Sequence, residues 1–129
     1  MKNLYVSWEE FGRMIDKLSE QIEGTFDGVY GVPRGGIIIA LCLSHKLNIP
    51  ILLYPTENSL VVDDISDTGK TLASHKNKKI ACLFSTDWTI TKPDWFVDKK
   101  LNKDEWIIFP WEENMEDRQT TLDEFIEEE

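Results

Sequence analysis

Residues 60–72, LVVDDISDTGKTL, constrain the fold more than any other stretch of this chain. Three apolar residues are followed by two adjacent carboxylates, and a Thr-Gly-Lys-Thr turn then opens what we interpret as a helix. An apolar strand with this ending places acids at its carboxyl end, and the backbone N–H groups of such a turn can surround an anion. The stretch therefore predicts a strand, turn and helix of an α/β protein, with a place to hold a phosphate group.

A second unit of the same kind lies nearer the N-terminus. Residues 27–32, DGVYGV, predict a strand that runs into the turn 33–36, PRGG, and then into an apolar helix over residues 37–47. A capping box of Ser7 and Glu10 predicts an earlier helix. Other strands are expected over residues 50–54, 79–84, 95–97 and 106–109, with a short helix over residues 70–75. This alternation predicts a three-layer α/β/α fold around a mostly parallel five-stranded sheet.

The common strand order 2-1-3-4-5 would bring the two turns together. In an open parallel sheet the ligand binds beyond the carboxyl ends of the strands, where the strand order reverses. That crevice lies between strands 1 and 3, which are followed by the PRGG turn and the DTGKT turn. Two phosphate-type turns are therefore expected on the two sides of one cleft.

The charge of the chain is negative and uneven. The net charge is −10, and residues 112–129 hold nine acids and one arginine, which leaves −2 for the remainder. We expect one domain over residues 1–111 and an acidic tail over residues 112–129 that can form a short helix. Because the chain has no basic stripe and no long apolar run, we expect no nucleic-acid or membrane partner and a cytoplasmic location. Cys42 and Cys82 lie in apolar runs and are expected to be buried free thiols.

Two other phosphate-handling sites fit the sequence less well. A Walker A loop requires a glycine five positions before Gly69, and Asp64 stands there. A phosphatase or receiver-type Mg²⁺ pocket would require an aspartate after the first strand, where the chain has PRGG instead.

Residues 60–72 resemble the thirteen-residue 5-phosphoribosyl pyrophosphate (PRPP) motif of the type I phosphoribosyltransferases. Asp67 within it, with SWEEF at 7–11, VPRGG at 32–36 and WIIFPWE at 106–112, is similar to the 6-oxopurine branch, and to its bacterial xanthine-guanine type. The resemblance covers about residues 7–112. It implies an enzyme that transfers phosphoribose from PRPP to a purine base, forms a nucleoside 5′-monophosphate and pyrophosphate, uses Mg²⁺ and assembles as a homodimer or homotetramer.

The resemblance also implies a role for each matching residue, with catalysis assigned to Asp67 and Arg34. Asp67 would exchange a proton with purine N7, and Arg34 would stabilise the leaving group. Ribose would be bound by Asp63 and Asp64, the 5′-phosphate by Asp67, Thr68, Gly69, Lys70 and Thr71, and pyrophosphate by Arg34, Gly35 and Gly36. The base would be bound by Ile65, Trp106 and the backbone of Ile107. Glu112 would reach Mg²⁺ through water. Trp106 suits base stacking and a core position equally well, since apolar residues follow it.

Two features depart from the family pattern. Only residues 55–59 separate the second and third strands, where the family has a long lid hairpin, so we expect the lid to be absent. The lysine that follows the fourth strand in the 6-oxopurine branch corresponds here to Thr86, and Lys92 is the nearest later lysine. A lid excludes water from a reacting centre, so the alternative function is a PRPP- or nucleotide-sensing module with little turnover.

Overall fold

A computed structural model describes residues 2–112 of the chain. It begins with strand β1 (Lys2–Tyr5) and helix α1 (Trp8–Gln21). The predicted capping box is confirmed, because Ser7 Oγ accepts the N–H of Glu10 at 3.0 Å and Glu10 Oε1 accepts the N–H of Ser7 at 3.3 Å. The predicted acidic-tail helix lies outside the described residues. No helix in the described part of the chain is long and apolar enough to cross a membrane.

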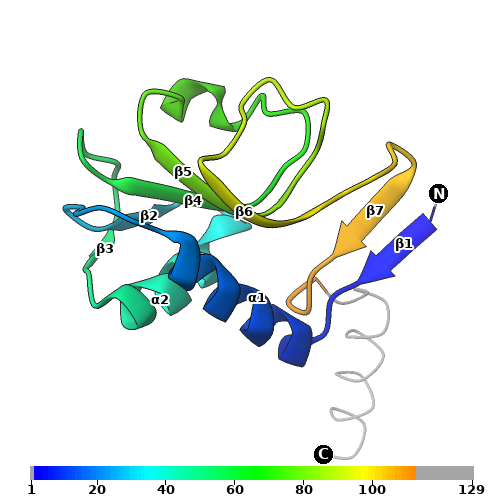
Figure 1. Cartoon of the computed structure of the whole chain (residues 1–129), viewed down its shortest axis with the longest axis horizontal. Helices are drawn as coiled ribbons and strands as arrows, with labels where there is room; N and C mark the ends of the chain where they lie inside the picture. Colours follow the sequence, from blue (N-terminus) through cyan, green and yellow to red (C-terminus); the bar gives the residue numbers. More distant parts are fainter. Residues whose placement is uncertain (1, 113–129) are drawn as a thin grey trace, which may run out of the picture.

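Five parallel strands form the main sheet (Figure 1). They are β2 (Val29–Gly31), β3 (Ile51–Leu52), β4 (Leu60–Ser66), β5 (Lys79–Ser85) and β6 (Trp95–Lys99), arranged in the order β3-β2-β4-β5-β6. Numbered within this sheet, that is the predicted order 2-1-3-4-5, and every neighbouring pair is parallel. Helix α2 (Gly36–Leu47) connects β2 to β3. The predicted fold class is confirmed.

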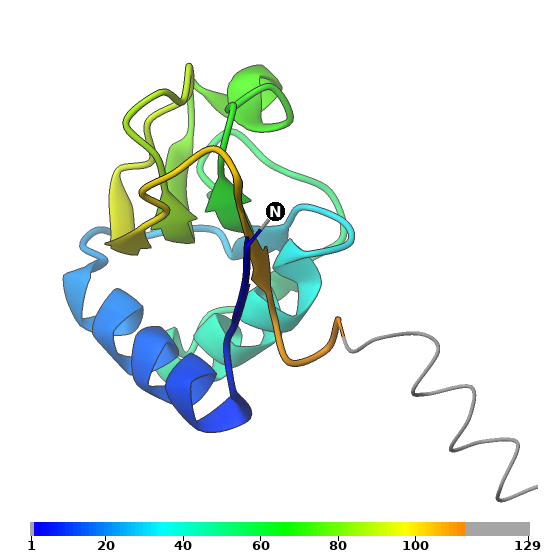
Figure 2. The ribbon, with the colours of Figure 1, turned by 90° about the vertical axis from the view of Figure 1, so that its right-hand side faces the viewer.

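The two faces of the sheet are covered unequally. Figure 2 shows α1 and α2 together on one face, and the short 3-10 helix η1 (Leu72–His75) on the other. Alternate residues of β4 face opposite sides: Leu60 and Val62 join the core beneath α1 and α2, whereas Val61 packs with Leu72 of η1. The central strand β4 is therefore buried on both sides, as its unbroken apolar run requires, whereas the edge strands β3 and β6 are partly exposed.

The helix predicted after the DTGKT turn is only this one 3-10 turn. Residues 67–71 are used by the turn itself and β5 begins at Lys79, so too few residues remain for a regular α-helix. Cys42 and Cys82 are both free, as predicted; Cys82 is buried beneath η1, whereas Cys42 is only half-buried.

The strand predicted near the C-terminus lies outside the main sheet. β7 (Glu105–Ile108) pairs in parallel with β1, and the two lie side by side away from the five strands (Figure 1). β1 was not predicted, and its four residues are all exposed and carry no alternating pattern. This small sheet supports β7, which carries Trp106.

Candidate active site

The two predicted turns meet at one end of the sheet. β2 and β4 are neighbours, and the Val32 N–H donates to the Val62 carbonyl over 2.9 Å. A Cβ atom added to Gly36 would collide with that carbonyl, and one added to Gly35 would collide with the Asp64 carboxylate. Because glycine alone permits so close an approach, the PRGG turn lies directly against the acidic end of β4.

The acid pair at the end of β4 is partly buried. Asp63 is 7% exposed and Asp64 is half-buried. Asp63 Oδ1 accepts the N–H of Asp64 at 2.8 Å, which fixes its carboxyl group. Burial, and then the charge of Asp64, raise the pKa of Asp63 to about 8. Asp63 therefore holds a proton at neutral pH and would release it when a ligand favours its ionised form.

The DTGKT turn forms a cradle for an anion. The N–H groups of Thr68, Gly69 and Thr71 have no hydrogen-bond acceptor within residues 2–112. Residues 63–72 line a cavity of about 230 Å³ at this turn. Unpartnered backbone donors around a cavity are suited to phosphate oxygens, so this geometry supports the anion site that the sequence predicted.

A neighbouring loop holds the cradle in shape. Thr68 O accepts the N–H of Ile90 at 2.9 Å, and Gly69 O accepts the hydroxyl of Thr91 at 2.6 Å. Gly69 has φ +82°, and a Cβ there would meet Thr91 N at 2.5 Å. Gly69 is therefore required by the backbone conformation and by the packing of this loop, in addition to any contact with a ligand.

Arg34 is exposed on the PRGG turn, beside the N-terminus of α2. Its guanidinium forms no ion pair or hydrogen bond in the described part of the chain. The peptide bond between Pro33 and Arg34 is cis. The N–H groups of Gly36 and Ile37 already donate to the Val32 and Arg34 carbonyls, whereas those of Arg34 and Gly35 have no acceptor within residues 2–112. A free guanidinium next to these two N–H groups can bind a second anionic group.

Asp67 lies in a cluster of polar side chains that the sequence analysis only partly foresaw. Its Oδ2 is 2.6 Å from Lys100 Nζ, and its Oδ1 accepts the indole N–H of Trp88 at 2.8 Å. Thr86 donates its hydroxyl to the Asp67 carbonyl over 2.6 Å. Thr86 therefore supports the backbone of the turn, and Lys92 lines a different cavity.

Lys100 is the residue that the sequence analysis missed. It is 5% exposed, and its Nζ lies 5.9 Å from the ring centroid of Trp106, which is 53% exposed. The structure thus brings Asp67 and Trp106 together around one buried ammonium. The signal was available, because Lys100 directly follows the fifth strand of the sheet and so lies at the carboxyl ends, where ligands bind.

The remaining residues predicted to bind the base or the metal lie in different environments. Ile65 lines the cavity at the cradle. The side chain of Ile107 is buried in the core, which does not bear on the backbone contact predicted for this residue. The Glu112 carboxylate is exposed and accepts the N–H of Phe109 at 3.1 Å. A direct metal-binding group of three acidic, histidine or cysteine side chains is absent from residues 2–112. Carboxylate oxygens are the ligands that Mg²⁺ prefers, so Asp63 and Asp64 are the residues that would hold this ion together with the substrate.

No strand or helix lies between β3 and β4, so the predicted absence of a lid hairpin is confirmed for this connection. The link is instead a compact turn in which Thr56 N donates to Ser59 Oγ over 3.1 Å. Thr56 also donates its hydroxyl to Asp27 over 2.8 Å, which ties the link to the start of β2. The cleft beside β4 therefore has no cover from this segment.

Comparison with solved structures finds the same fold in purine phosphoribosyltransferases. A crystal structure of a purine phosphoribosyltransferase from Pyrococcus horikoshii is 35% identical, covers 88% of this chain and 97% of its own, and superposes with a TM-score of 0.76. A Helicobacter pylori xanthine-guanine-hypoxanthine phosphoribosyltransferase, at 24% identity and a TM-score of 0.73, shares the fold over 92% of this chain and 99% of its own.

Sequence comparison gives a consistent result. A xanthine-guanine phosphoribosyltransferase from Idiomarina loihiensis is 28% identical over 86% of this chain and 88% of its own length. One from Chromohalobacter salexigens is 27% identical over 83% of this chain and 82% of its own length. Comparison with models of protein families finds no match.

Proposed function

The chain belongs to the type I phosphoribosyltransferases of the purine branch, and we propose that its acceptor is a 6-oxopurine. The reaction joins a nitrogen of the base to C1′ of PRPP while the bond from C1′ to pyrophosphate breaks. The products are a nucleoside 5′-monophosphate and pyrophosphate, and the base loses one proton.

The observation that carries the choice of base is the position of Lys100. An ammonium group has three N–H donors, and in the described residues only Asp67 accepts from this one. Lys100 Nζ lies 5.9 Å over one face of the Trp106 ring, so a purine stacked on that same face would bring its edge to the remaining donors. An oxygen at C6 accepts such a hydrogen bond, whereas the amino group of adenine does not, so the site favours 6-oxopurines.

The other side chains of the site each bind a different part of PRPP. Asp63 and Asp64 accept hydrogen bonds from the ribose hydroxyls, and the cradle of residues 67–71 binds the 5′-phosphate. Arg34 and the N–H groups beside it stabilise the charge that builds on the leaving pyrophosphate. Mg²⁺, when bound, neutralises pyrophosphate charge and is held by the acid pair. Asp67 takes up the proton that the base loses, and its carboxylate is held in place by Lys100 and Trp88.

The short link between β3 and β4 predicts a side reaction. Without a lid, water reaches the electron-deficient C1′ centre more readily. The enzyme is therefore expected to hydrolyse some PRPP, which releases pyrophosphate when no base is present.

The test is to incubate the full chain with PRPP, Mg²⁺ and each of hypoxanthine, guanine, xanthine and adenine, and to measure the nucleotide and pyrophosphate formed. We expect nucleotide from the 6-oxopurines and much less from adenine. Asp67→Asn should lose turnover, and the matched control Asp87→Asn, at an exposed position nearby, should retain it. Binding of PRPP without product from any base would overturn the proposal and favour the sensing alternative. Efficient use of adenine alone would overturn the base assignment.

An apolar patch supports assembly as a homodimer or homotetramer. Ile37, Leu41, Ile51, Leu53 and Tyr54 are exposed on α2, β3 and the segment that follows, and Leu53 is 83% exposed. Several of them line a cavity of about 290 Å³. Contiguous apolar surface of this kind marks protein contacts, and a second copy of the chain would cover it.

Light scattering can test this assembly. The wild type and Leu101→Glu, which changes an exposed leucine elsewhere, should have the mass of a dimer or tetramer, and Leu53→Glu should shift toward the monomer. A monomeric wild type, or a Leu53→Glu protein of unchanged mass, would contradict the assembly.

A further inference from the structure

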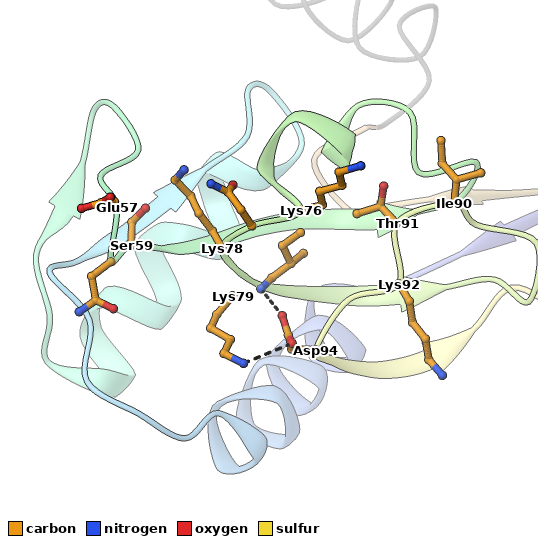
Figure 3. A pocket seen from close by; sticks show the side chains of 12 residues that line it. Glu57, Ser59, Lys76, Lys78, Lys79, Ile90, Thr91, Lys92 and Asp94 are labelled. Carbon is orange, nitrogen blue, oxygen red and sulfur yellow. Dashed lines mark hydrogen bonds and ion pairs between the residues drawn. The ribbon is translucent and has the colours of Figure 1, made fainter.

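A second cavity lies at the opposite end of the sheet from the candidate active site. Its volume is about 440 Å³, within the range of small-molecule sites. It is bordered by the residues that precede β4, β5 and β6, at their amino ends, and by the loop that contains Ile90 (Figure 3). The acid pair and the phosphate cradle lie at the carboxyl ends of the same strands.

The charge of this cavity is opposite to that of the chain. Lys76, Lys78, Lys79 and Lys92 line it together with only two acids, Glu57 and Asp94. The formal charge of the lining is therefore +2, in a chain whose net charge is −10. Such a local concentration of lysines attracts anions even though the whole molecule repels them.

Three of the four lysines are available to a ligand. Asp94 is occupied, because it lies 3.7 Å from Lys79 Nζ and accepts the N–H of Ile80 at 2.8 Å. Lys76, Lys78 and Lys92 form no ion pair within residues 2–112. Figure 3 shows these three side chains pointing in different directions, with their ammonium groups directed away from one another. Lysine stems are flexible, so an anion with several charged groups could draw them inward.

The uncharged residues of the lining suit a ligand that is larger than a simple inorganic ion. Asn77 makes no hydrogen bond in the described part of the chain and can donate its amide N–H groups to oxygen. Ile90 is exposed at the edge of the cavity, where it offers an apolar surface to an organic group. A molecule with several linked phosphates can contact several lysines at once, which a single phosphate cannot do as readily.

The cavity is physically connected to the phosphate cradle. Ile90 and Thr91 line it, and the same two residues donate hydrogen bonds to the Thr68 and Gly69 carbonyls. A ligand that orders the loop of Ile90 and Thr91 would therefore act on the shape of the cradle.

We propose that this lysine-lined cavity binds a small molecule carrying two or more linked phosphates and that its occupancy changes PRPP binding at the cradle. The binding site stands independently of the proposed reaction, whereas the effect on PRPP rests on it.

The binding test is an NMR titration of the full-length chain with tripolyphosphate, ATP or citrate, followed at the amide signals of Asn77 and Lys78. Both phosphate compounds should shift these signals, and citrate should do so much more weakly. Tighter binding of ATP would identify a nucleotide as the ligand, and tighter binding of tripolyphosphate an inorganic polyphosphate. The double variant Lys78→Gln/Lys92→Gln should raise the dissociation constant by about tenfold or more.

A double variant with the same charge change, Lys2→Gln/Lys17→Gln, is the control, since both lysines are exposed elsewhere. It should bind as the wild type does. Signal shifts confined to residues 33–36 and 67–71 would overturn the site. So would an equal loss of phosphate binding in the two double variants, or citrate binding as tight as that of the phosphate compounds. None of these results depends on turnover, so failure here is distinct from failure of the proposed reaction.

The effect on the cradle is tested by the KM for PRPP at a fixed concentration of the tighter-binding phosphate compound. Competition at the active site itself would affect every variant equally. We expect the KM for PRPP to change by a further factor of about two or more in the wild type and in the control. This further change should be absent from Lys78→Gln/Lys92→Gln. The same change in all three proteins would overturn the coupling.

Discussion

The raised pKa of Asp63 predicts that the protein loses stability as the pH rises toward 8. Burial and the adjacent Asp64 raise this pKa to about 8, whereas an unfolded aspartate titrates near 3.9. Between these values the folded protein binds one proton more than the unfolded chain does. The free energy of unfolding therefore falls with rising pH, and it levels off once Asp63 ionises in the folded state.

The size of this effect follows from the linkage. One proton corresponds to about 1.4 kcal/mol per pH unit, so about 2 kcal/mol is lost between about pH 6 and about pH 8. For a domain of this size that corresponds to a fall of roughly 8 °C in Tm. Asp63→Asn removes the titration while Asn Oδ1 can still accept the N–H of Asp64. We therefore expect this variant to be more stable than the wild type at about pH 8 and to show a flatter pH profile, although it loses PRPP binding.

The assay is thermal and urea unfolding across this pH range. The control is Asp98→Asn, because Asp98 Oδ1 accepts the N–H of the next residue at 2.8 Å as Asp63 does, but at an exposed position. This control should keep the wild-type slope. If Asp63→Asn also kept the wild-type slope, the claim that Asp63 holds a proton in the folded protein would be refuted.

Three further substitutions test the site. Gly69→Ala combines a positive φ with a collision against Thr91 N, so it should cost about 2 kcal/mol or more of unfolding free energy, measured by urea denaturation, and weaken PRPP binding. Gly35→Ala should displace the Asp64 carboxylate and lower kcat/KM strongly while Tm changes little. A fall in Tm without a fall in kcat/KM would contradict the place of Gly35 in the site. Lys100→Gln should lower kcat/KM for hypoxanthine by about 30-fold or more, from the loss of a charged hydrogen bond of about 2 kcal/mol, with a smaller change for adenine. An equal loss for both bases would show that Lys100 only supports the fold.

The features that the sequence predicted are those coded by adjacent residues. The strand that ends in Asp63 and Asp64, the glycine-containing turns and the alternation of strands with helices are all local, and the strand order then follows from a general rule of α/β sheets. Their juxtaposition was predictable because parallel strands bring their carboxyl ends to one edge.

The features that were missed depend on long-range packing. Lys100 meets Asp67 across 33 positions of sequence, whereas the family pattern favours Thr86 or Lys92 at this place. β1 is too short and too polar to predict alone, and it is a strand because β7 pairs with it. The raised pKa of Asp63 similarly arises from burial, which the sequence suggested only as an apolar run before the acids.

A crystal structure of the full chain with guanosine 5′-monophosphate tests the central claim most directly. The account predicts the phosphate in the cradle of residues 67–71, the ribose hydroxyls on Asp63 and Asp64, and the base stacked on Trp106 with its O6 within hydrogen-bonding distance of Lys100 Nζ. A nucleotide bound elsewhere would contradict the assignment of the active site. A base that lies away from both Trp106 and Lys100 would contradict the assignment of a 6-oxopurine.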